Sequence, residues 1–422
     1  MKTKNIVHEL IEENKEYLAL EMAPREKKNE LSDLLKTGEI IIISGVRRCG
    51  KSYLLLSGLK DLPGGFYVNF EDERLAGFKA EDLGELYNAF IEIKNSENKI
   101  YFLLDEIQEV KNWEKWVRRM HDSKKLNFIL TGSNASLLAP EIATTLGGRS
   151  IEISLYPLSF KEFLEVKKFK QKYLTETEVS KIKHYLNEYI EYGGFPKIAL
   201  TNGMYEKKNI LQGYFNTIVY KDIVNRFEIR DVEAFREFAV YLITNSSTLV
   251  SYYKLKNIFR IGVETAKNYL SYMETAFLLF NVPIFSYKIK DQMNYPRKIY
   301  SIDTGLRNAA SFRFMEDQGK LYENVVAVEL KRRGKEFYYW KDDRQREVDF
   351  VIKEGLKPKH LIQVCYDIKN TNTKQREIKA LASAMNEFKI NECMVITENY
   401  EAREEADGGV VIYTPLWKWL LE

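Results

Sequence analysis

Short runs of strand-forming residues alternate with helical stretches over the first 155 residues. The five runs lie at 40–44, 66–70, 100–104, 127–131 and 150–154. Between them the apolar residues follow helical spacing. This alternation is typical of a parallel sheet with helices on both faces. The sequence therefore predicts an α/β fold for this part of the chain.

The pattern on either side of these strands predicts further domains. Residues 1–36 read as helices, and Ile6, Val7, Leu10 and Ile11 share one apolar face, as in a packing collar. Glycine and proline interrupt a helical, tyrosine-rich stretch at 191–200. Residues 248–286 resemble a helix-turn-helix followed by strands, the pattern of a winged helix, although an ordinary helical core segment would also explain them. Beyond them, strands are expected at 337–340, 348–352, 360–368 and 393–397, with a helix at about 375–387.

These patterns predict four domains. We expect the α/β domain with its helical collar at 1–155, a helical lid at 156–205, a winged-helix-like domain at 206–298 and a mixed α/β domain at 299–422.

A phosphate-binding loop follows the first strand. The pattern G-x-x-x-x-G-K-[ST] is matched by Gly45, Val46, Arg47, Arg48, Cys49, Gly50, Lys51 and Ser52, and Tyr53 comes next. Glycines let backbone N–H groups surround phosphate oxygens, while the lysine reaches the β- and γ-phosphates. The preceding buried strand and the following helix are the context that the motif requires. We expect residues 45–53 to bind ATP, with Ser52 as a Mg²⁺ ligand.

Two acids end the third predicted strand. Asp105 can bind Mg²⁺ through water, and Glu106 can orient and polarise the attacking water. An acidic pair at a strand end is often only a solvated helix cap. The phosphate loop elsewhere in the same domain favours the catalytic interpretation.

Three further sites could take part in hydrolysis. Thr131, Ser133 or Asn134 could sense the γ-phosphate after the fourth strand, and Ser133 is the favoured candidate. Arg149 precedes the fifth strand, where its guanidinium could reach phosphate in its own or a neighbouring subunit, or remain solvated. Asn69 is a weaker candidate for positioning the glutamate.

Cys49 could carry a reactive thiolate, although a small filler residue is the preferred explanation.

Composition narrows the class of protein. The 422 residues carry 64 Lys and Arg against 61 Asp and Glu, so the formal charge of +3 does not imply a nucleic-acid partner. Three cysteines make a disulfide framework unexpected and favour a reducing compartment. No signal peptide is recognisable, and no apolar run approaches the roughly 18 residues of a membrane span. A cytoplasmic protein without a membrane partner is expected.

In its order of motifs the chain resembles AAA+ superfamily ATPases, and more closely the archaeal and bacterial single-chain ATPases with a C-terminal domain of unknown function. The motifs that carry this resemblance are DEIQ at 105–108, GR at 148–149, YPLSF at 156–160, YGGFP at 192–196 and YSIDTGL at 300–306. The resemblance implies ATP hydrolysis with magnesium, a winged-helix-like middle and a C-terminal half similar to the PD-(D/E)XK nuclease fold.

The nuclease resemblance is incomplete at its metal site. Glu323 and Asp349 would supply the acids from a helix and a strand, but Gln363 and Cys365 stand where an acid and a lysine are required. A site displaced along the strand to Asp367 and Lys369 is the alternative. The basic residues of 331–346 are diluted by acids, so a solvated face explains them as well as a DNA track does.

Two functions from different classes remain open. The first is an ATPase motor or switch coupled to DNA or RNA. The second is a nucleotide-dependent signalling or scaffold protein whose C-terminal domain binds a protein partner. An ATP-gated nuclease is disfavoured by Gln363 and Cys365. Homo-oligomers are expected if Arg149 acts across a subunit interface.

Overall fold

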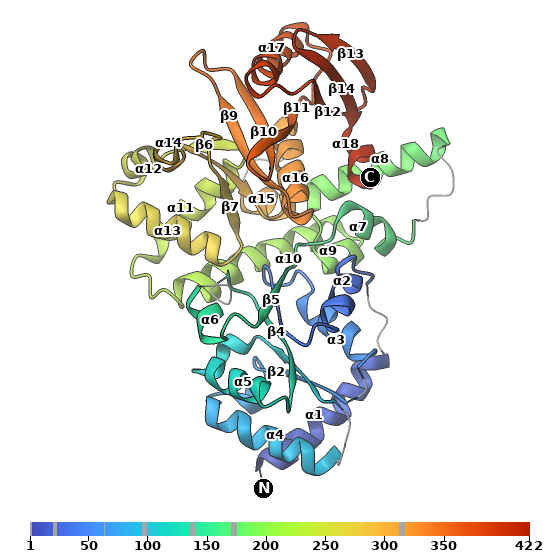
Figure 1. The fold of residues 1–422 in the computed structure, drawn as a ribbon, viewed down its shortest axis with the longest axis vertical. Coiled ribbons are helices and arrows are strands. Elements are labelled where there is room, and N and C mark those ends of the chain that lie inside the picture. The colour runs from blue at the N-terminus through green and yellow to red at the C-terminus, as the bar shows by residue number, and fades with distance from the viewer. Residues whose placement is uncertain are drawn as a thin grey trace. The chain divides into compact units, whose positions relative to one another are not determined.

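A computed structural model describes residues 2–19, 23–62, 64–94, 99–135, 140–169, 175–311 and 317–422. The chain divides into two compact units, Met1–Tyr156 and Pro157–Glu422 (Figure 1). Among the described residues, no helix combines the length and apolar character needed to cross a membrane.

A five-stranded parallel sheet forms the centre of the first unit. Its strands are β1 (Ile40–Ser44), β2 (Gly65–Asn69), β3 (Tyr101–Asp105), β4 (Asn127–Gly132) and β5 (Ser150–Ser154), in the order β2-β3-β4-β1-β5. Every residue of β1 is buried, as its run of isoleucines predicts for a central strand. The predicted parallel α/β fold is confirmed, and each strand lies within one residue of its expected position.

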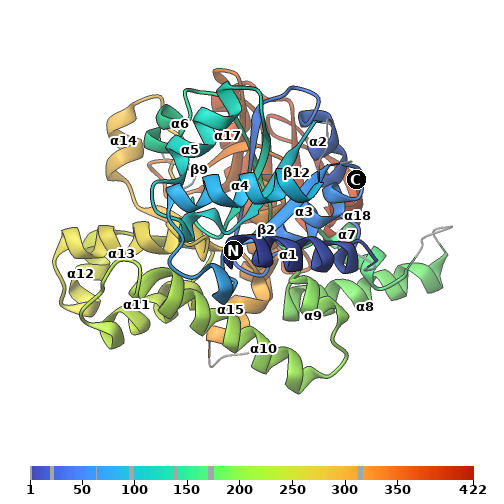
Figure 2. The same ribbon diagram turned by 90° about the horizontal axis from the view of Figure 1, so that it is seen from below.

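Helices cover both faces of this sheet. They are α1 (Lys2–Ala19), α2 (Lys27–Leu34), α3 (Lys51–Leu59), α4 (Ala80–Lys94), α5 (Trp113–Asp122) and α6 (Pro140–Thr145), with short 3₁₀ turns at Glu73–Leu75 and Ile107–Glu109. Helices α1 and α4 lie side by side (Figure 2). The apolar face of α1 is confirmed, since Val7, Leu10 and Ile11 are buried in the same core as Phe66 and Phe102.

The second unit begins with helices. These are α7 (Phe160–Val166), α8 (Glu176–Tyr192), α9 (Pro196–Leu200), α10 (Met204–Thr217), a π-helical turn at Ile218–Val224, and α11 (Val232–Thr244). Ser159 and Glu162 form a capping box at the start of α7. This arrangement fixes where the chain re-enters a helix after Pro157.

A small antiparallel sheet follows. Its order is β6-β8-β7, and the chain runs through β6 (Thr248–Val250), α12 (Tyr252–Phe259), α13 (Val263–Thr275), β7 (Leu279–Val282), α14 (Ile289–Asn294) and β8 (Arg297–Ser301). Strand β8 pairs with both β6 and β7. The domain boundary expected between residues 298 and 299 therefore falls inside β8.

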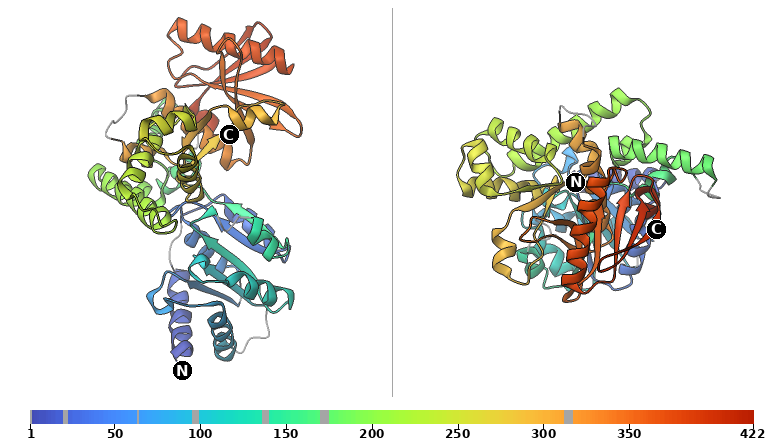
Figure 3. Two further views of the ribbon diagram at one scale, coloured as in Figure 1. Left: turned by 90° about the vertical axis from the view of Figure 1, so that its left-hand side faces the viewer. Right: turned by 90° about the horizontal axis from the view of Figure 1, so that it is seen from above.

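The chain ends in a six-stranded mixed sheet. Its elements are α15 (Thr304–Ala310), α16 (Gln318–Arg332), β9 (Glu336–Lys341), β10 (Glu347–Glu354), β11 (Lys357–Val364), α17 (Thr371–Phe388), β12 (Glu392–Thr397), β13 (Ala402–Ala406), β14 (Gly409–Pro415) and α18 (Leu416–Leu421). The strand order is β13-β14-β12-β11-β10-β9. Helix α17 packs against β10 and β11 (Figure 3). A helical region followed by a mixed-sheet domain is thus confirmed.

One predicted strand was too long. The apolar run at 360–368 suggested a strand over its whole length, but β11 ends at Val364. Asn370 accepts hydrogen bonds from the backbone N–H groups of Asn372 and Thr373, which starts α17. The chain needs the intervening residues to turn from strand to helix, so Asp367 and Lys369 lie outside β11. The displaced metal site on that strand face is therefore wrong.

Candidate functional site

The phosphate loop connects β1 to α3, and its backbone explains its glycines. A Cβ atom on Gly45 would lie 2.1 Å from the carbonyl oxygen of Leu155, so no other residue fits there. Gly50 has a φ of 105°, in a region that residues with side chains rarely adopt. Helix α3 begins at the next residue, so the N–H groups of its first turn border the loop.

Lys51 is folded back over this loop. Its side chain is 3% exposed, and its Nζ donates to the carbonyl oxygens of Gly45 at 3.1 Å and Val46 at 3.4 Å. The nearest carboxylate oxygen of Glu106 is 3.4 Å away. Burial has the largest single effect and lowers the pKa of Lys51, but Glu106, Cys49 and Asp105 together outweigh it and the pKa is raised. The loop therefore holds a buried ammonium group with its charge retained.

Asp105 is surrounded by hydroxyl groups. The Tyr67 hydroxyl donates to its Oδ2 at 2.8 Å, the Thr131 hydroxyl donates to Oδ1, and the Ser52 side chain also hydrogen-bonds to the carboxylate. Burial and the neighbouring Glu106 raise the pKa of Asp105, whereas these hydroxyl contacts oppose the rise. The structure thus brings Asp105 and Ser52 together from β3 and α3, as the sequence predicts.

Glu106 keeps its negative charge through contacts that differ from those of Asp105. Its Oε2 accepts from the backbone N–H of Ser133 at 3.0 Å and from Gln108 at 2.5 Å. Burial raises the pKa of Glu106, but Lys51, Gln108 and Arg47 together bring the pKa down to about 2. Its backbone N–H donates to Thr131 Oγ1 at 3.1 Å, which anchors the turn after β3.

The other residues proposed near the γ-phosphate have different positions. Ser133 is buried and contacts Glu106 through its backbone N–H, and Thr131 joins both acids through its hydroxyl. Asn69 accepts from the backbone N–H of Glu71 at 3.0 Å, a local turn contact. Its role in positioning the glutamate stays a prediction.

Arg149 lies where the strands of the sheet begin, whereas its own phosphate loop lies where they end. Ser150 pairs with Ile40 at the start of β1, whereas the loop follows Ser44 at the end of that strand. Five residues of strand span roughly 16 Å, more than an arginine side chain reaches. The guanidinium forms an ion pair with Asp122 and is about half exposed. A contact of Arg149 with phosphate on its own loop is therefore wrong.

Other loop residues have the following surroundings. Cys49 is buried, and burial raises the pKa of its thiol, which favours the small filler residue over the reactive thiolate. Arg47 pairs with Glu71 at 2.8 Å. Tyr53 on α3 is 51% exposed, so its ring is free of the core.

Two side chains of this site were not predicted from the sequence. Tyr67 supports Asp105 from within β2, and Arg25 donates to the carbonyl oxygens of Cys49 and Tyr156, both at 2.7 Å. An inward-facing tyrosine in an apolar strand signalled the first. No local pattern signalled Arg25, because its partners are distant in sequence.

In the second unit, Glu323 on α16 and Asp349 on β10 do come together. Both contact the Lys298 ammonium, at 3.0 Å and 2.8 Å. Gln363 on β11 is in the same cluster, where its side chain accepts from the Asp349 backbone N–H at 3.0 Å. Lys298 was not predicted from the sequence, because its strand β8 reads RKIYS and a lysine next to an arginine looks like an ordinary exposed residue.

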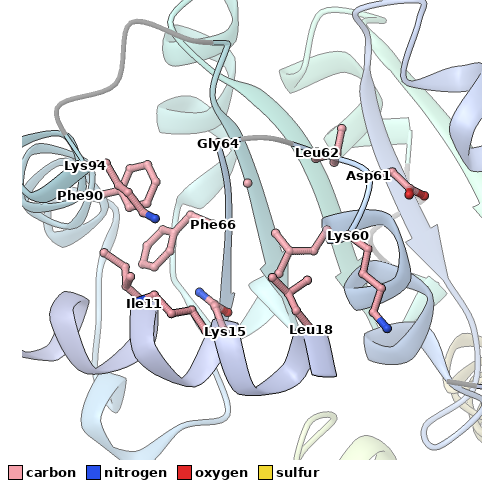
Figure 4. Close-up of a pocket in the computed structure, with 13 residues that line it drawn as sticks. Ile11, Lys15, Leu18, Lys60, Asp61, Leu62, Gly64, Phe66, Phe90 and Lys94 are labelled. Atoms are coloured by element: carbon pink, nitrogen blue, oxygen red, sulfur yellow. The ribbon is translucent and has the colours of Figure 1, made fainter. Parts of the chain in front are cut away.

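The first unit also has a cavity of about 350 Å³ near the start of β2 (Figure 4). Phe66 and Phe90 form part of its wall, and Lys15, Lys60 and Lys94 are among its other lining residues. The cavity lies where the strands of the sheet begin, at Gly65 of β2. The phosphate loop and Asp105 lie at the other end of the strands, since Asp105 ends the paired strand β3. It is therefore separate from the candidate site.

Three family models match the chain. An AAA domain matches residues 37–164, which contain the phosphate loop and both acids. A domain of unknown function, DUF8612, matches residues 183–317, and another, DUF4143, matches residues 318–419.

Relatives are similar over almost the whole chain. An uncharacterized protein of Methanocaldococcus jannaschii, MJ1544, is 39% identical, with 95% of this chain and 93% of the relative covered. An uncharacterized protein of Haemophilus influenzae is 33% identical, with 93% and 98% covered. Among solved structures, the Walker-type ATPase PABY2304 of Pyrococcus abyssi matches with a TM-score of 0.49 and 16% identity, covering 70% of this chain and 99% of that one.

Proposed function

The chain belongs to the family of AAA-domain proteins that includes MJ1544 of Methanocaldococcus jannaschii, and from that premise we propose that it binds and hydrolyses ATP. The observation that carries the proposal is the buried Lys51 ammonium, which lies between its own phosphate loop and Glu106. A cation held beside the N-terminus of a helix is suited to a phosphate chain.

The roles of the two charged side chains follow from their contacts. Lys51 would exchange its loop carbonyls and Glu106 for phosphate oxygens of ATP. Glu106 would then lose the partner that lowers its pKa most, while burial would still raise that pKa. Binding of ATP would therefore convert Glu106 from a weak base into a stronger one that can orient and polarise water.

Magnesium is the cofactor that this site fits. Ser52 and Asp105 present adjacent hydroxyl and carboxylate oxygens, the hard ligands that Mg²⁺ prefers. When bound, the ion would neutralise phosphate charge. Thr131 and Tyr67 hold the Asp105 carboxylate in place for this role.

Two substitutions test the proposal. Lys51→Ala should abolish binding of a fluorescent ATP analogue, whereas Glu106→Gln should retain binding and lose hydrolysis at least a hundredfold. Lys115→Ala, which removes an exposed lysine of α5, is the control and should leave both properties unchanged. Equal loss of binding in the first two variants would contradict the separate roles.

A coupling to nucleic acid is the first candidate for the biological role. Helix α11, strand β6, helices α12 and α13 and strands β7 and β8 follow one another in the order of a winged helix. Helix α12 carries Lys254 and Lys256, and Arg260 directly follows it; all three are exposed, which supports a contact with phosphates. DNA or RNA should then stimulate ATP hydrolysis, and that stimulation should fall steeply as salt rises.

A nucleotide-dependent signalling or scaffold role is the second candidate. The α14 segment between β7 and β8 exposes Tyr287 and Ile289 at 73% each and Met293 at 67%, apolar surface that suits a protein partner. Glu106→Gln protein loaded with ATP should retain such a partner, and adding Ile289→Ser and Met293→Ser should release it. Stimulation by nucleic acid without any retained protein would favour the first candidate.

A further inference from the structure

Three carboxylates in the second unit surround one buried lysine. Lys298 on β8 has a side chain that is 4% exposed. Its Nζ lies 3.0 Å from Glu323 on α16, 2.7 Å from Glu347 and 2.8 Å from Asp349, both on β10. Three elements far apart in the sequence therefore converge on one ammonium group.

A second set of contacts fixes the carboxylates around it. The Tyr300 hydroxyl donates to Glu323 at 2.7 Å, and the Val364 backbone N–H donates to Asp349 Oδ2 at 3.0 Å. Gln363 accepts from the Asp349 backbone N–H and donates to Glu377 at 2.7 Å. A carboxylate at position 363 could not donate to Glu377, so glutamine fits this position better than an acid.

The charges of the cluster also favour an ammonium ion. Burial would lower the pKa of Lys298, but Asp349 and Glu323, together with Tyr300 and Glu347, outweigh it and hold the pKa well above its ordinary value. Burial and the neighbouring Asp349 raise the pKa of Glu323. The lysine thus remains charged and offsets the carboxylates that converge on it.

The geometry does not suit a divalent metal. The oxygens lie 2.7 to 3.0 Å from Nζ, the spacing of charge-assisted hydrogen bonds. Magnesium needs oxygens at about 2.0–2.1 Å. No group of three or more His, Cys, Asp or Glu within the described ranges is arranged to hold a metal ion.

We propose that Lys298 is a built-in cation that takes the place of a divalent metal between Glu323 and Asp349. Because its ammonium group offsets the carboxylate charges, the cluster needs no metal ion and binds one only when the lysine is removed. The ammonium joins β8 to α16 and β10, which makes the cluster a lock between the small sheet and the C-terminal sheet. This inference is independent of ATP hydrolysis, because it rests only on contacts within the second unit.

Manganese binding to nucleotide-free protein tests the proposal. Wild type and Asp349→Asn should give the same Mn²⁺ titration, since wild type has no site that needs Asp349. Lys298→Met should gain one Mn²⁺ site at least tenfold tighter than any site in wild type, and Lys298→Met with Asp349→Asn should lose it. Mn²⁺ should also raise the melting temperature of Lys298→Met by several degrees while leaving that of wild type unchanged.

Two results would overturn the proposal. One is a Mn²⁺ site in wild type that Asp349→Asn removes, which would show that metal and lysine share the cluster. This comparison does not depend on the folding of Lys298→Met. The other is a folded Lys298→Met protein that gains no Mn²⁺ site, which would show that the carboxylates cannot serve a metal even without the lysine.

Discussion

Two adjacent acids at the end of β3 have opposite pKa shifts because their partners differ. Asp105 has hydroxyl partners, and burial leaves its pKa raised. Glu106 faces the Lys51 ammonium, and its pKa falls to about 2. In the free protein the charge pair therefore involves Glu106 and Lys51, while Asp105 and Ser52 form a neighbouring oxygen pair.

The depressed pKa of Glu106 predicts a pH dependence of stability. A carboxyl group whose pKa is lower in the folded state stabilises the fold above its unfolded pKa of 4.5, and this contribution is lost as pH falls through about 2. The shift corresponds to about 3 kcal/mol. Urea unfolding should show that Glu106→Gln lowers the free energy of unfolding most at neutral pH, and that the difference from wild type shrinks below pH 4.5. A difference independent of pH would contradict the ion pair.

Thiol chemistry gives a second prediction at the residue scale. All three cysteines, Cys49, Cys365 and Cys393, are free and buried, and burial raises the pKa of each thiol. We expect native protein to react slowly with a thiol reagent and denatured protein to react at all three positions. Rapid modification of Cys49 that ATP prevents would show that the loop opens and would restore the reactive-thiolate alternative.

At the scale of elements, a buried aspartate joins two glycine-containing turns of the second unit. Asp303, which caps α15, accepts from the backbone N–H of Gly194 at 2.8 Å and of Leu306 at 3.1 Å. Burial raises the pKa of Asp303 to about 6 despite these contacts. The motifs at 192–196 and 300–306 are thus two halves of one structural contact, which holds the turn after α8 against the start of α15.

Gly193→Ala tests this contact. Gly193 has a φ of 77°, and a Cβ atom there would lie 2.0 Å from Asp303 Oδ1. We expect the variant to lose about 1–3 kcal/mol of unfolding free energy, through backbone strain and displacement of the carboxylate. Gly213→Ala is the matched control, because the α10 position has open space and should gain up to about 1 kcal/mol. Similar stability of the two variants would show that the turn tolerates a side chain.

At the scale of the whole molecule, a catalytic role of Arg149 would require a second subunit. Arg149 lies at the end of the strands that is far from its own phosphate loop. The remaining catalytic role is therefore an action on the phosphate of a neighbouring subunit. Asp122, the partner of Arg149, belongs to the same chain, and an exposed ion pair of this kind contributes little stability. The guanidinium could therefore leave Asp122 at small cost when a second subunit approaches.

Mixing two inactive proteins tests a role in trans. Arg149→Ala supplies an intact phosphate loop, and Lys51→Ala supplies an intact arginine. We expect the mixture to recover a measurable part of wild-type ATP hydrolysis, because some interfaces would combine both intact halves. Asp122→Asn, which frees the arginine without removing it, should hydrolyse ATP at a near wild-type rate. Absence of rescue at every mixing ratio would argue against an arginine acting between subunits.

Local chemistry in the sequence was enough to predict the five-stranded sheet, the phosphate loop and both acids. The isoleucine run of β1 and the glycines at 45 and 50 meet steric and burial requirements that act within a few residues. The acids at 105 and 106 could be predicted for the same reason, since they end a strand whose neighbours in the sheet can also be recognised as apolar runs. Strands β13 and β14 and the end of β11 were missed or misplaced, because pairing with distant strands and a helix cap decide them.

Only the tertiary structure decided which charges meet. Lys298, Glu323 and Asp349 are up to 51 positions apart, and each by itself looks like an ordinary charged residue. The same holds for Arg25 against the phosphate loop and for Arg149, whose distance from that loop follows from strand register. Periodicity reports which face of an element is buried, whereas electrostatic partnership depends on how elements from distant parts of the chain pack together.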